Sequence, residues 1–256
     1  MGPRRVLVTG AEGVIGTAVR EHLDGRYELT SLTLTAQEFP SHVADISDLE
    51  AIQPAFEGVD AVVHLAASAG LETPWDDVLR NNIVGTYNVF EAARLAGVSR
   101  VVFASSNHVV GMFELDGAPA LYEPDDERSY DHEAEIRPDS LYGVSKAYGE
   151  ALGRMYMERH GLCVFCLRIG AVRAHDDPTS PNVNPLIDLD AEGRWNRLRA
   201  VWLSRRDCVE LSARCLDVDD VSWAVVYGVS GNPRRFWDLT HGRELLGWEP
   251  RDAAPV

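Results

Sequence analysis

The sequence contains little lysine, little cysteine and no long apolar run. Its 256 residues include 24 basic and 40 acidic side chains, for a net charge of −16, and Lys146 stands alone against 23 arginines. A surface this acidic repels phosphate backbones and anionic lipids, which argues against nucleic-acid and membrane partners. No stretch approaches the roughly 20 apolar residues of a membrane span, and the N-terminal MGPRRVLVTG lacks the apolar segment of a signal peptide. We therefore expect a cytoplasmic protein.

The cysteines are too few and too scattered for a disulfide framework. Cys163 and Cys166 form a CxxC pattern inside the apolar run LCVFCLR. On a strand, residues three apart point to opposite faces, and no second pair of ligands accompanies them. We interpret both cysteines as packing residues and predict no metal site.

Short apolar runs alternate with segments of helical periodicity over the first two-thirds of the chain. Val14, Ile15, Ala18, Val19 and Leu23, for example, share one helical face. Because parallel strands need crossover connections, this alternation predicts a doubly wound parallel sheet of the Rossmann type, an α/β fold with helices on both faces. Strands are expected at 5–8, 29–33, 61–65, 101–104, 162–168 and 224–227, and further helices at 78–96, 140–160, 197–215 and 240–246.

The last third of the chain has a different character. Residues 172–193 contain several prolines, aspartates and asparagines and predict a long irregular segment, of the kind that often forms a lid or a binding loop. The residues after this segment are too few for an independent domain. We expect residues 1–256 to form a single domain in which 172–256 contribute most of a small C-terminal substrate-binding annex.

The segment TGAEGVIG, residues 9–16, lies directly between the first predicted strand and the first predicted helix. Glycines at 10, 13 and 16 permit a tight turn and a close approach to a pyrophosphate, which then sits on the free N–H groups of the helix N-terminus. The same glycines would also suit a plain structural turn. Their place between strand and helix favours a dinucleotide site, with Val14 and Ile15 beside it.

Tyr142 and Lys146 lie four residues apart in YGVSK and share one face of a predicted helix. An ammonium group next to a phenol stabilises the phenolate, so we expect Tyr142 to act as a base near neutral pH. Lysine is also compact enough to reach a ribose hydroxyl. A solvated Tyr–Lys pair is the alternative.

Ser106 and Asn107 follow a predicted strand in FASSNH. In an open parallel sheet, ligands bind beyond the carboxyl ends of the strands, so both side chains are expected to project into the site. A serine hydroxyl there can donate to the oxygen that is oxidised or reduced. Ordinary turn chemistry is the alternative for these residues.

These motifs together resemble the extended short-chain dehydrogenase/reductase superfamily of NAD-dependent sugar epimerases and dehydratases. The resemblance rests on TGxxGxxG, Asp45, Asn82 in NxxGT, Ser-Ser before VVG, and YGVSK. It implies NAD as cofactor and Ser106, Tyr142 and Lys146 as the catalytic residues. The cofactor-binding residues it implies are Gly10, Gly13, Val14, Ile15, Gly16, Asp45, Ile46, Leu65, Ala66, Ala67, Asn82, Tyr142 and Lys146.

Several longer segments are similar to the uronate dehydrogenases, which oxidise C1 of galacturonate or glucuronate with NAD. They include VVFASSNHVVG, RPDSLYGVSKAYGEALGRMY and FWDLTHGRELLGWEP. This similarity implies a sugar site lined by Asn107 and His108, with Ser68 near a sugar hydroxyl. It also implies that Arg197 holds the substrate carboxylate by two parallel bonds, although Arg197 could equally be one more surface arginine. Family members often dimerise, so a homodimer is expected.

The sequence departs from this pattern at the cofactor and at the sugar. Leu34 stands where the family has an acidic residue for the adenosine ribose. No arginine replaces it to receive a 2′-phosphate and Glu12 would repel one, so NAD is expected, with NADP left open. Ala171 stands where the subfamily has a serine, so we expect a reshaped sugar pocket, and the substrate need not be uronate itself.

Other interpretations of the same motifs remain open. A nucleotide-sugar epimerase would use the same three catalytic residues, but it usually has a larger C-terminal region than the 110 residues that follow Lys146. A dehydratase would carry an acidic pair where Asn107 and His108 stand. A non-catalytic NAD-sensing regulator typically lacks the Tyr–Lys pair. The sequence favours NAD-dependent oxidation of a sugar hydroxyl, at C1 of a uronic acid or a related sugar.

Overall fold

Seven parallel strands form one sheet, in the order β3-β2-β1-β4-β5-β6-β7, in the computed structural model, which describes residues 4–180 and 184–256. The chain builds outward from β1 to β3 and then crosses back to place β4 on the other side of β1. Such a switch point opens a ligand crevice at the carboxyl ends of the strands. The strands are β1 (Arg5–Thr9), β2 (Glu28–Thr33), β3 (His42–Val43), β4 (Ala61–His64), β5 (Arg100–Ser106), β6 (Cys163–Ile169) and β7 (Trp223–Gly228).

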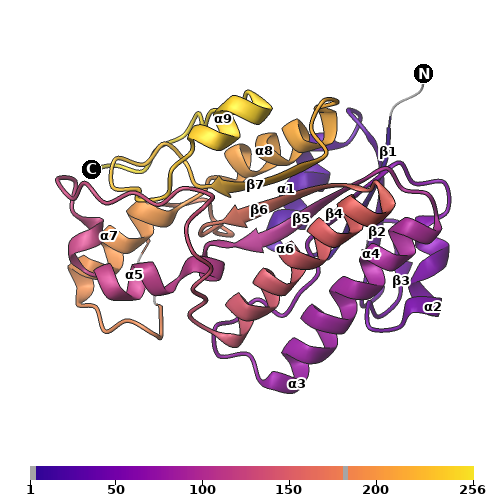
Figure 1. The fold of residues 1–256 in the computed structure, drawn as a ribbon, viewed down its shortest axis with the longest axis horizontal. Helices are drawn as coiled ribbons and strands as arrows, with labels where there is room; N and C mark the ends of the chain where they lie inside the picture. Colours follow the sequence, from indigo (N-terminus) through magenta and orange to yellow (C-terminus); the bar gives the residue numbers. More distant parts are fainter. Residues whose placement is uncertain (1–3, 181–183) are drawn as a thin grey trace.

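Helices cover both faces of the sheet (Figure 1). One face carries α1 and α8, which pack against each other, and the other carries α2, α4 and α6. The prediction of a doubly wound parallel sheet is confirmed. The helices are α1 (Val14–Leu23), α2 (Leu49–Ile52), α3 (Trp75–Asp77), α4 (Gly85–Leu95), α5 (Met112–Gly117), α6 (Leu141–His160), α7 (Ala191–Val201), α8 (Arg205–Asp217) and α9 (Thr240–Leu246).

Alternation along the strands divides the core into two layers. In β1, Val6 and Val8 belong to the cluster on the α1 and α8 side, whereas Leu7 between them belongs to the cluster on the α4 and α6 side. The period of two sends successive side chains to opposite faces. The two predicted packing cysteines divide in the same way, since Cys163 packs against the first cluster and Cys166 lies within the second.

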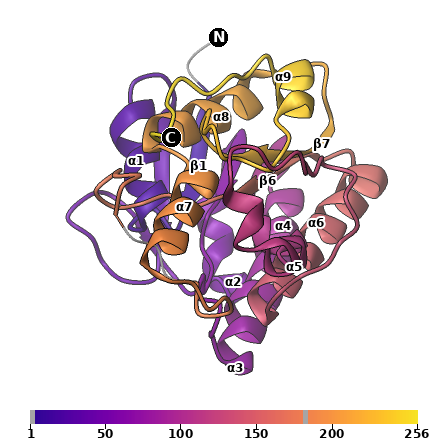
Figure 2. The ribbon, with the colours of Figure 1, turned by 90° about the vertical axis from the view of Figure 1, so that its left-hand side faces the viewer.

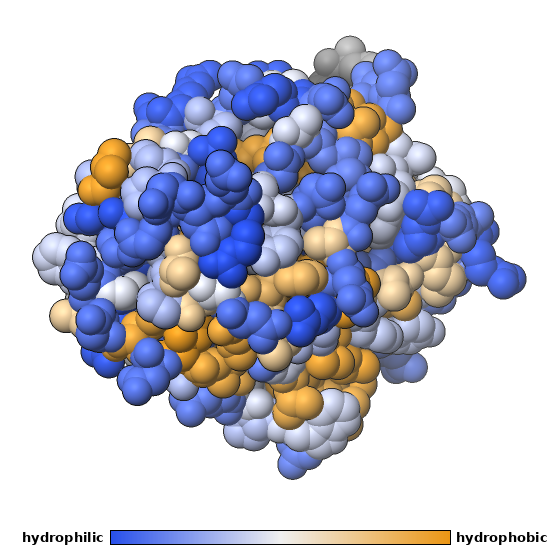
Figure 3. Space-filling view, turned by 60° about the vertical axis from the view of Figure 1, so that its left-hand side comes forward, coloured by the Kyte–Doolittle hydropathy of each residue, from blue (hydrophilic) through white to orange (hydrophobic). Residues whose placement is uncertain are grey.

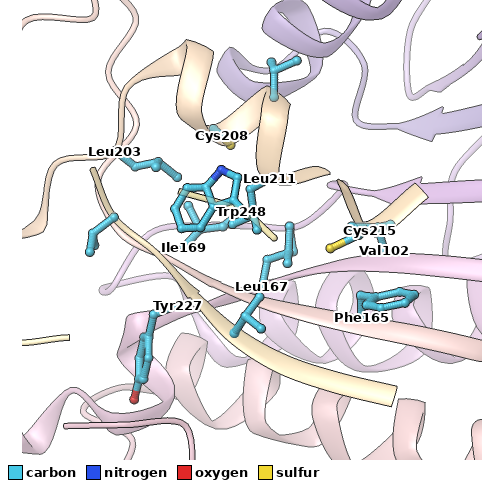
Figure 4. Packing of buried hydrophobic residues seen from close by; sticks show 14 of the residues in the cluster. Val102, Phe165, Leu167, Ile169, Leu203, Cys208, Leu211, Cys215, Tyr227 and Trp248 are labelled. Carbon is cyan, nitrogen blue, oxygen red and sulfur yellow. The ribbon is translucent and has the colours of Figure 1, made fainter. Parts of the chain in front are cut away.

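The layer under α8 shows how the C-terminal region is anchored (Figure 4). The Trp248 ring lies among Leu203, Leu211 and the β6 residue Ile169, and all four belong to one buried cluster. Burial of a large aromatic side chain is worth about 1.5–3 kcal/mol. This packing fixes the segment after α9 against the sheet.

The C-terminal third contains one clear error of sequence prediction. The helical pattern at 197–215 predicted one helix, but α7 and α8 are separate, with Trp202–Ser204 between them. Leu203 donates its N–H to the Ala171 carbonyl, and the Ser204 hydroxyl caps α8 by accepting from the Asp207 N–H. Periodicity did not reveal this break, because Leu203 is itself a buried apolar residue.

Helices α5 and α7 lie beyond the carboxyl ends of the strands and face the viewer in Figure 2. The chain between β6 and α7 contains no helix or long strand in its described residues, 170–180 and 184–190. The predicted irregular segment 172–193 is therefore confirmed up to Asp190, where α7 is capped, while residues 181–183 lie outside the described part. Short elements that the sequence did not indicate are β3, α2, α3 and α5.

The surface is mainly hydrophilic, as the composition requires. In Figure 3, hydrophobic residues gather in the lower half of the face shown, and hydrophilic residues surround them. Within the described residues, no helix is both long and apolar enough to cross a bilayer.

Candidate active site

Two adjoining cavities open at the carboxyl ends of the strands, and both touch Gly10, Gly13, Leu65 and Ala67. The first cavity, of about 460 Å³, brings together thirteen predicted site residues: Gly10, Gly13, Val14, Ile15, Gly16, Leu65, Ala67, Ser106, Asn107, His108, Tyr142, Lys146 and Arg197. The second cavity, of about 330 Å³, adds Asp45, Ile46, Ala66 and Ser68. Ser68 therefore lies apart from the other residues expected at the sugar, and Asn82 lines neither cavity.

The glycine turn after β1 fits tightly against the end of β4. Gly10 has a φ of +66°, and a Cβ there would lie 2.8 Å from the Ala66 nitrogen. A Cβ on Gly16 would lie 2.6 Å from the Ala11 Cα and still closer to the Gly10 carbonyl. Larger residues at these positions would therefore force the turn to move. Gly13 precedes α1 without a side-chain cap, so the helix N–H groups stay available to an anion.

Carboxylates, and no cationic side chain, are found among the described residues that line the second cavity. Asp45 accepts the Ser47 N–H at 2.9 Å and pairs with Arg80. Burial acts to raise the pKa of Asp45, but the Ser47 bonds and the Arg80 charge outweigh it and keep this pKa below its usual range. The lining includes the exposed Leu34 and the carboxylate of Glu12, and among the described residues it includes no lysine or arginine.

Helix α6 holds the predicted base and its cation one turn apart. The Ser140 hydroxyl caps the helix by accepting the Gly143 N–H at 3.1 Å. Lys146 Nζ lies 5.6 Å from the centroid of the Tyr142 ring and 4.9 Å from that of Phe103. The helical spacing read from the sequence therefore places both groups at the same cavity.

The pKa values of this pair differ from the expectation. Burial raises the pKa of Tyr142 to about 12. The negative charge of Asp139 also raises this pKa, and a hydrogen bond with Ser106 acts in the opposite direction. Burial also lowers the pKa of Lys146 to about 7. The expected lowering of the tyrosine pKa by Lys146 is wrong for the protein alone, because desolvation disfavours both charged forms.

The end of β5 delivers Ser106, Asn107 and His108 to the first cavity, as predicted. The Ser106 hydroxyl accepts the His108 N–H at 3.2 Å and so caps the short 3₁₀ turn that follows the strand. This turn directs three consecutive side chains toward one space.

The sequence did not reveal the partner of His108. Its Nδ1 lies 2.6 Å from Oδ2 of Asp139, a fully buried carboxylate that also accepts the Ser140 hydroxyl at 2.8 Å. An Nδ1–H bond to a carboxylate fixes the ring and leaves Nε2 as the acceptor nitrogen. In the sequence, the one local sign of this contact is that Asp139 directly precedes the helix-capping Ser140. The same pattern is common in turns, so it does not by itself indicate a partner for a histidine.

Asn82 joins the loop after β4 to α6. Its Oδ1 accepts the Ser68 N–H at 2.8 Å, and its Nδ2 donates to the Ser68 carbonyl and to the Ser145 hydroxyl, both at 3.0 Å. Every polar group of this buried side chain is thus engaged with the protein. Asn82 positions the cavity wall next to Lys146 and touches neither cavity itself.

Arg197 reaches the first cavity from α7 and is buried. Its Nε lies 2.8 Å from Oε1 of Glu114, and its Nη2 donates to Oε2 at 3.2 Å. Tyr122 donates its hydroxyl to the same carboxylate at 2.9 Å. Neither Glu114 nor Tyr122 was predicted from the sequence, because each lies in a short segment without a recognisable motif.

Comparison with known proteins places this architecture in a family. The model of the "NAD dependent epimerase/dehydratase family" matches residues 6–187. The chain belongs to this family. Two Haloferax volcanii proteins are each 40% identical to it. One is an NAD-dependent glucose-6-phosphate dehydrogenase, and the match covers 96% of this chain and 93% of that protein. The other is an L-arabinose 1-dehydrogenase (NAD(P)(+)), and the match covers 97% of this chain and 96% of that protein.

A solved member of the epimerase/dehydratase family has a similar structure. A uronate dehydrogenase variant from Agrobacterium tumefaciens, complexed with NAD, superposes with a TM-score of 0.80 at 33% identity. The match covers 98% of this chain and 86% of that one. The resemblance to the superfamily and to uronate dehydrogenases, inferred from sequence motifs, is confirmed.

Proposed function

We propose that this protein is an NAD-dependent dehydrogenase that oxidises a sugar hydroxyl, at C1 of a uronic acid or a related sugar. The observation that carries the proposal is that Ser106, Tyr142 and Lys146 face the same cavity as the glycine turn. Alcohol oxidation needs a proton acceptor and a hydride acceptor on either side of one carbon. The two Haloferax proteins and the uronate dehydrogenase, all dehydrogenases of sugars by name, support this interpretation.

Each catalytic residue has a distinct task in this proposal. Tyr142 takes the hydroxyl proton, Ser106 holds the same oxygen by a hydrogen bond, and Lys146 supports the phenolate and the ribose. NAD, when bound, supplies the hydride acceptor and a positive nicotinamide ring, a charge that favours the phenolate. The O–H and C–H bonds of the substrate break together, and a carbonyl forms at the carbon that loses hydride.

The two cavities fit NAD better than NADP. A Cβ on Gly10 or Gly16 would collide with the backbone of the turn or of the end of β4, so these glycines keep the turn compact, which would let a pyrophosphate approach the N-terminus of α1. Asp45 and Ile46 lie in the second cavity, where they would contact the adenine. A 2′-phosphate there would meet Glu12 and no lysine or arginine among the described lining residues.

We also propose a homodimer formed through α4 and α6. These helices pack against each other and expose large apolar side chains. They are Tyr87 on α4, Val84 directly before α4, and Leu141 and Val144 on α6. Two copies related by a two-fold axis would bury this face against itself.

The four cysteines are free thiols, which supports the expected cytoplasmic location.

Light scattering after size-exclusion chromatography tests the dimer. The wild type should have twice the 28.3 kDa chain mass, and Tyr87→Glu should be a monomer. Ile136→Glu, at an exposed apolar position outside these helices, is the matched control and should remain dimeric. A monomeric wild type would refute the dimer.

Reduction of NAD by the purified protein tests the activity. Uronates, neutral aldoses, sugar phosphates and nucleotide sugars are offered in turn with NAD and with NADP. NADH formation with a free sugar or sugar acid supports the proposal. Binding of NAD without oxidation of any sugar would contradict it.

A further inference from the structure

The positive charge expected to hold a substrate carboxylate is already neutralised by the protein. Arg197 contacts both oxygens of Glu114, and Glu114 has no exposed surface. Tyr122 supplies a further donor to the same carboxylate. Arg197 Nη2 donates a hydrogen bond to this carboxylate, so the protein itself already supplies the guanidinium with a counter-charge.

A uronate placed against Arg197 would therefore bring a second carboxylate into a buried pair. One guanidinium would face two negative charges, and like charges in a site of low dielectric are costly. We propose, on the basis of the dehydrogenase function above, that the sugar site takes an uncharged aldose and that Glu114 determines this specificity by excluding uronates.

The remaining lining supports an uncharged substrate. Among the described residues that line the first cavity, Lys146 is the one lysine and Arg197 the one arginine. Lys146 lies beside the Tyr142 ring, and burial lowers its pKa to about 7. A sugar phosphate would thus also lack a free counter-charge in this cavity.

Asn184 offers a polar contact suited to a sugar hydroxyl. It is buried, lines the first cavity, and accepts the Leu186 N–H through Oδ1 at 2.9 Å. Within the described residues, its Nδ2 is buried and has no hydrogen-bond partner. Leaving such a donor unsatisfied destabilises the site, and a hydrogen bond to a ring hydroxyl would remove this penalty. Ala171 lines the same cavity and provides no such group.

The first experiment compares matched substrates on the wild type. kcat/KM is measured with NAD for two matched sets of sugars. Galactose is compared with galacturonate, and glucose with glucuronate and with glucose 6-phosphate. L-arabinose is added as a further neutral sugar. We expect each neutral sugar to exceed its charged analogue by at least about tenfold, because repulsion by Glu114 falls on the charged analogues alone. A preference for a uronate or a sugar phosphate would overturn this inference while leaving the dehydrogenase function intact. Oxidation of no sugar would overturn the function itself.

The second experiment releases the charge of Arg197. Glu114→Gln should raise the ratio of galacturonate to galactose kcat/KM by at least about tenfold, since the guanidinium becomes free for a carboxylate. Asp116→Asn is the matched control, because it removes one negative charge from the same helix at an exposed position paired with Arg137. The control should leave the ratio unchanged. An equal ratio in Glu114→Gln and wild type, with both folded, would overturn the role of Glu114.

A binding measurement keeps the test independent of turnover and of folding of the Glu114 variant. Tyr142→Phe with saturating NAD should bind galactose more tightly than galacturonate in equilibrium dialysis. Adding Asn184→Ala should weaken galactose binding by about five- to tenfold, the loss of one neutral hydrogen bond. Tighter binding of galacturonate, or no effect of Asn184→Ala, would contradict the proposed site.

Discussion

His108 Nδ1 lies 2.6 Å from Asp139 Oδ2, so the histidine that lines the substrate cavity is held by a fully buried carboxylate. Asp139 directly precedes the Ser140 cap of α6, the helix that carries Tyr142. One short segment therefore orients His108 and starts the catalytic helix. This coupling makes Asp139 a positioning residue for the proposed reaction.

Asp139→Asn should lower kcat/KM for the sugar by up to about 100-fold, because an amide no longer fixes the His108 tautomer and a small misplacement in a site costs this much. The dissociation constant for NAD should stay within about twofold. Steady-state kinetics and fluorescence titration with NADH measure the two effects. Unchanged kcat/KM in a folded variant would show that His108 needs no such partner.

Tyr142→Phe tests the assignment of the base. Loss of a general base lowers turnover by about 10²–10⁴-fold, whereas the phenyl ring should preserve the cavity and cofactor affinity. Tyr148→Phe, on the same helix but absent from the lining of both cavities, is the matched control and should retain activity. Near-normal turnover of Tyr142→Phe would exclude Tyr142 as the base.

Gly16→Ala tests the glycine turn as the pyrophosphate site. The added Cβ would lie 2.6 Å from the Ala11 Cα, so the turn must move, and NAD affinity should fall by at least about tenfold. Gly242→Ala is the control, because a Cβ there meets only ordinary contacts of 3.7 Å or more. Calorimetric titration with NADH compares both variants. Equal affinity in the wild type, Gly16→Ala and Gly242→Ala would show that the turn is not part of the cofactor site.

The sequence predicted those parts of the site that depend on local spacing. Tyr142 and Lys146 share a helical face, and Ser106 and Asn107 come at the end of a strand, so local spacing placed them at one edge of the sheet, whereas His108 was implied by the resemblance. The pairing of Glu114 with Arg197 joins residues 83 positions apart and follows no periodic rule. The pKa of Tyr142 was misjudged for a related reason, because its burial depends on packing that a sequence motif does not describe.

Lys146 gives a pH-dependent test of burial in the protein without cofactor. Its pKa falls from 10.5 to about 7 on folding, so between these values the unfolded chain binds a proton that the folded protein does not. The free energy of unfolding should therefore rise with pH across this window, by up to about 1.4 kcal/mol per pH unit from this one group.

Urea denaturation of wild type and Lys146→Met from pH 6 to pH 9.5 isolates that contribution. All other titrating groups are shared, so the variant should be more stable than wild type near pH 6, and its advantage should shrink as the pH rises. Tyr142 acts in the opposite direction above pH 10, where its raised pKa of about 12 keeps the folded form protonated, and the chosen range avoids it. A stability difference that does not change with pH would mean that Lys146 stays charged in the folded protein, with its ammonium group solvated within the cavity.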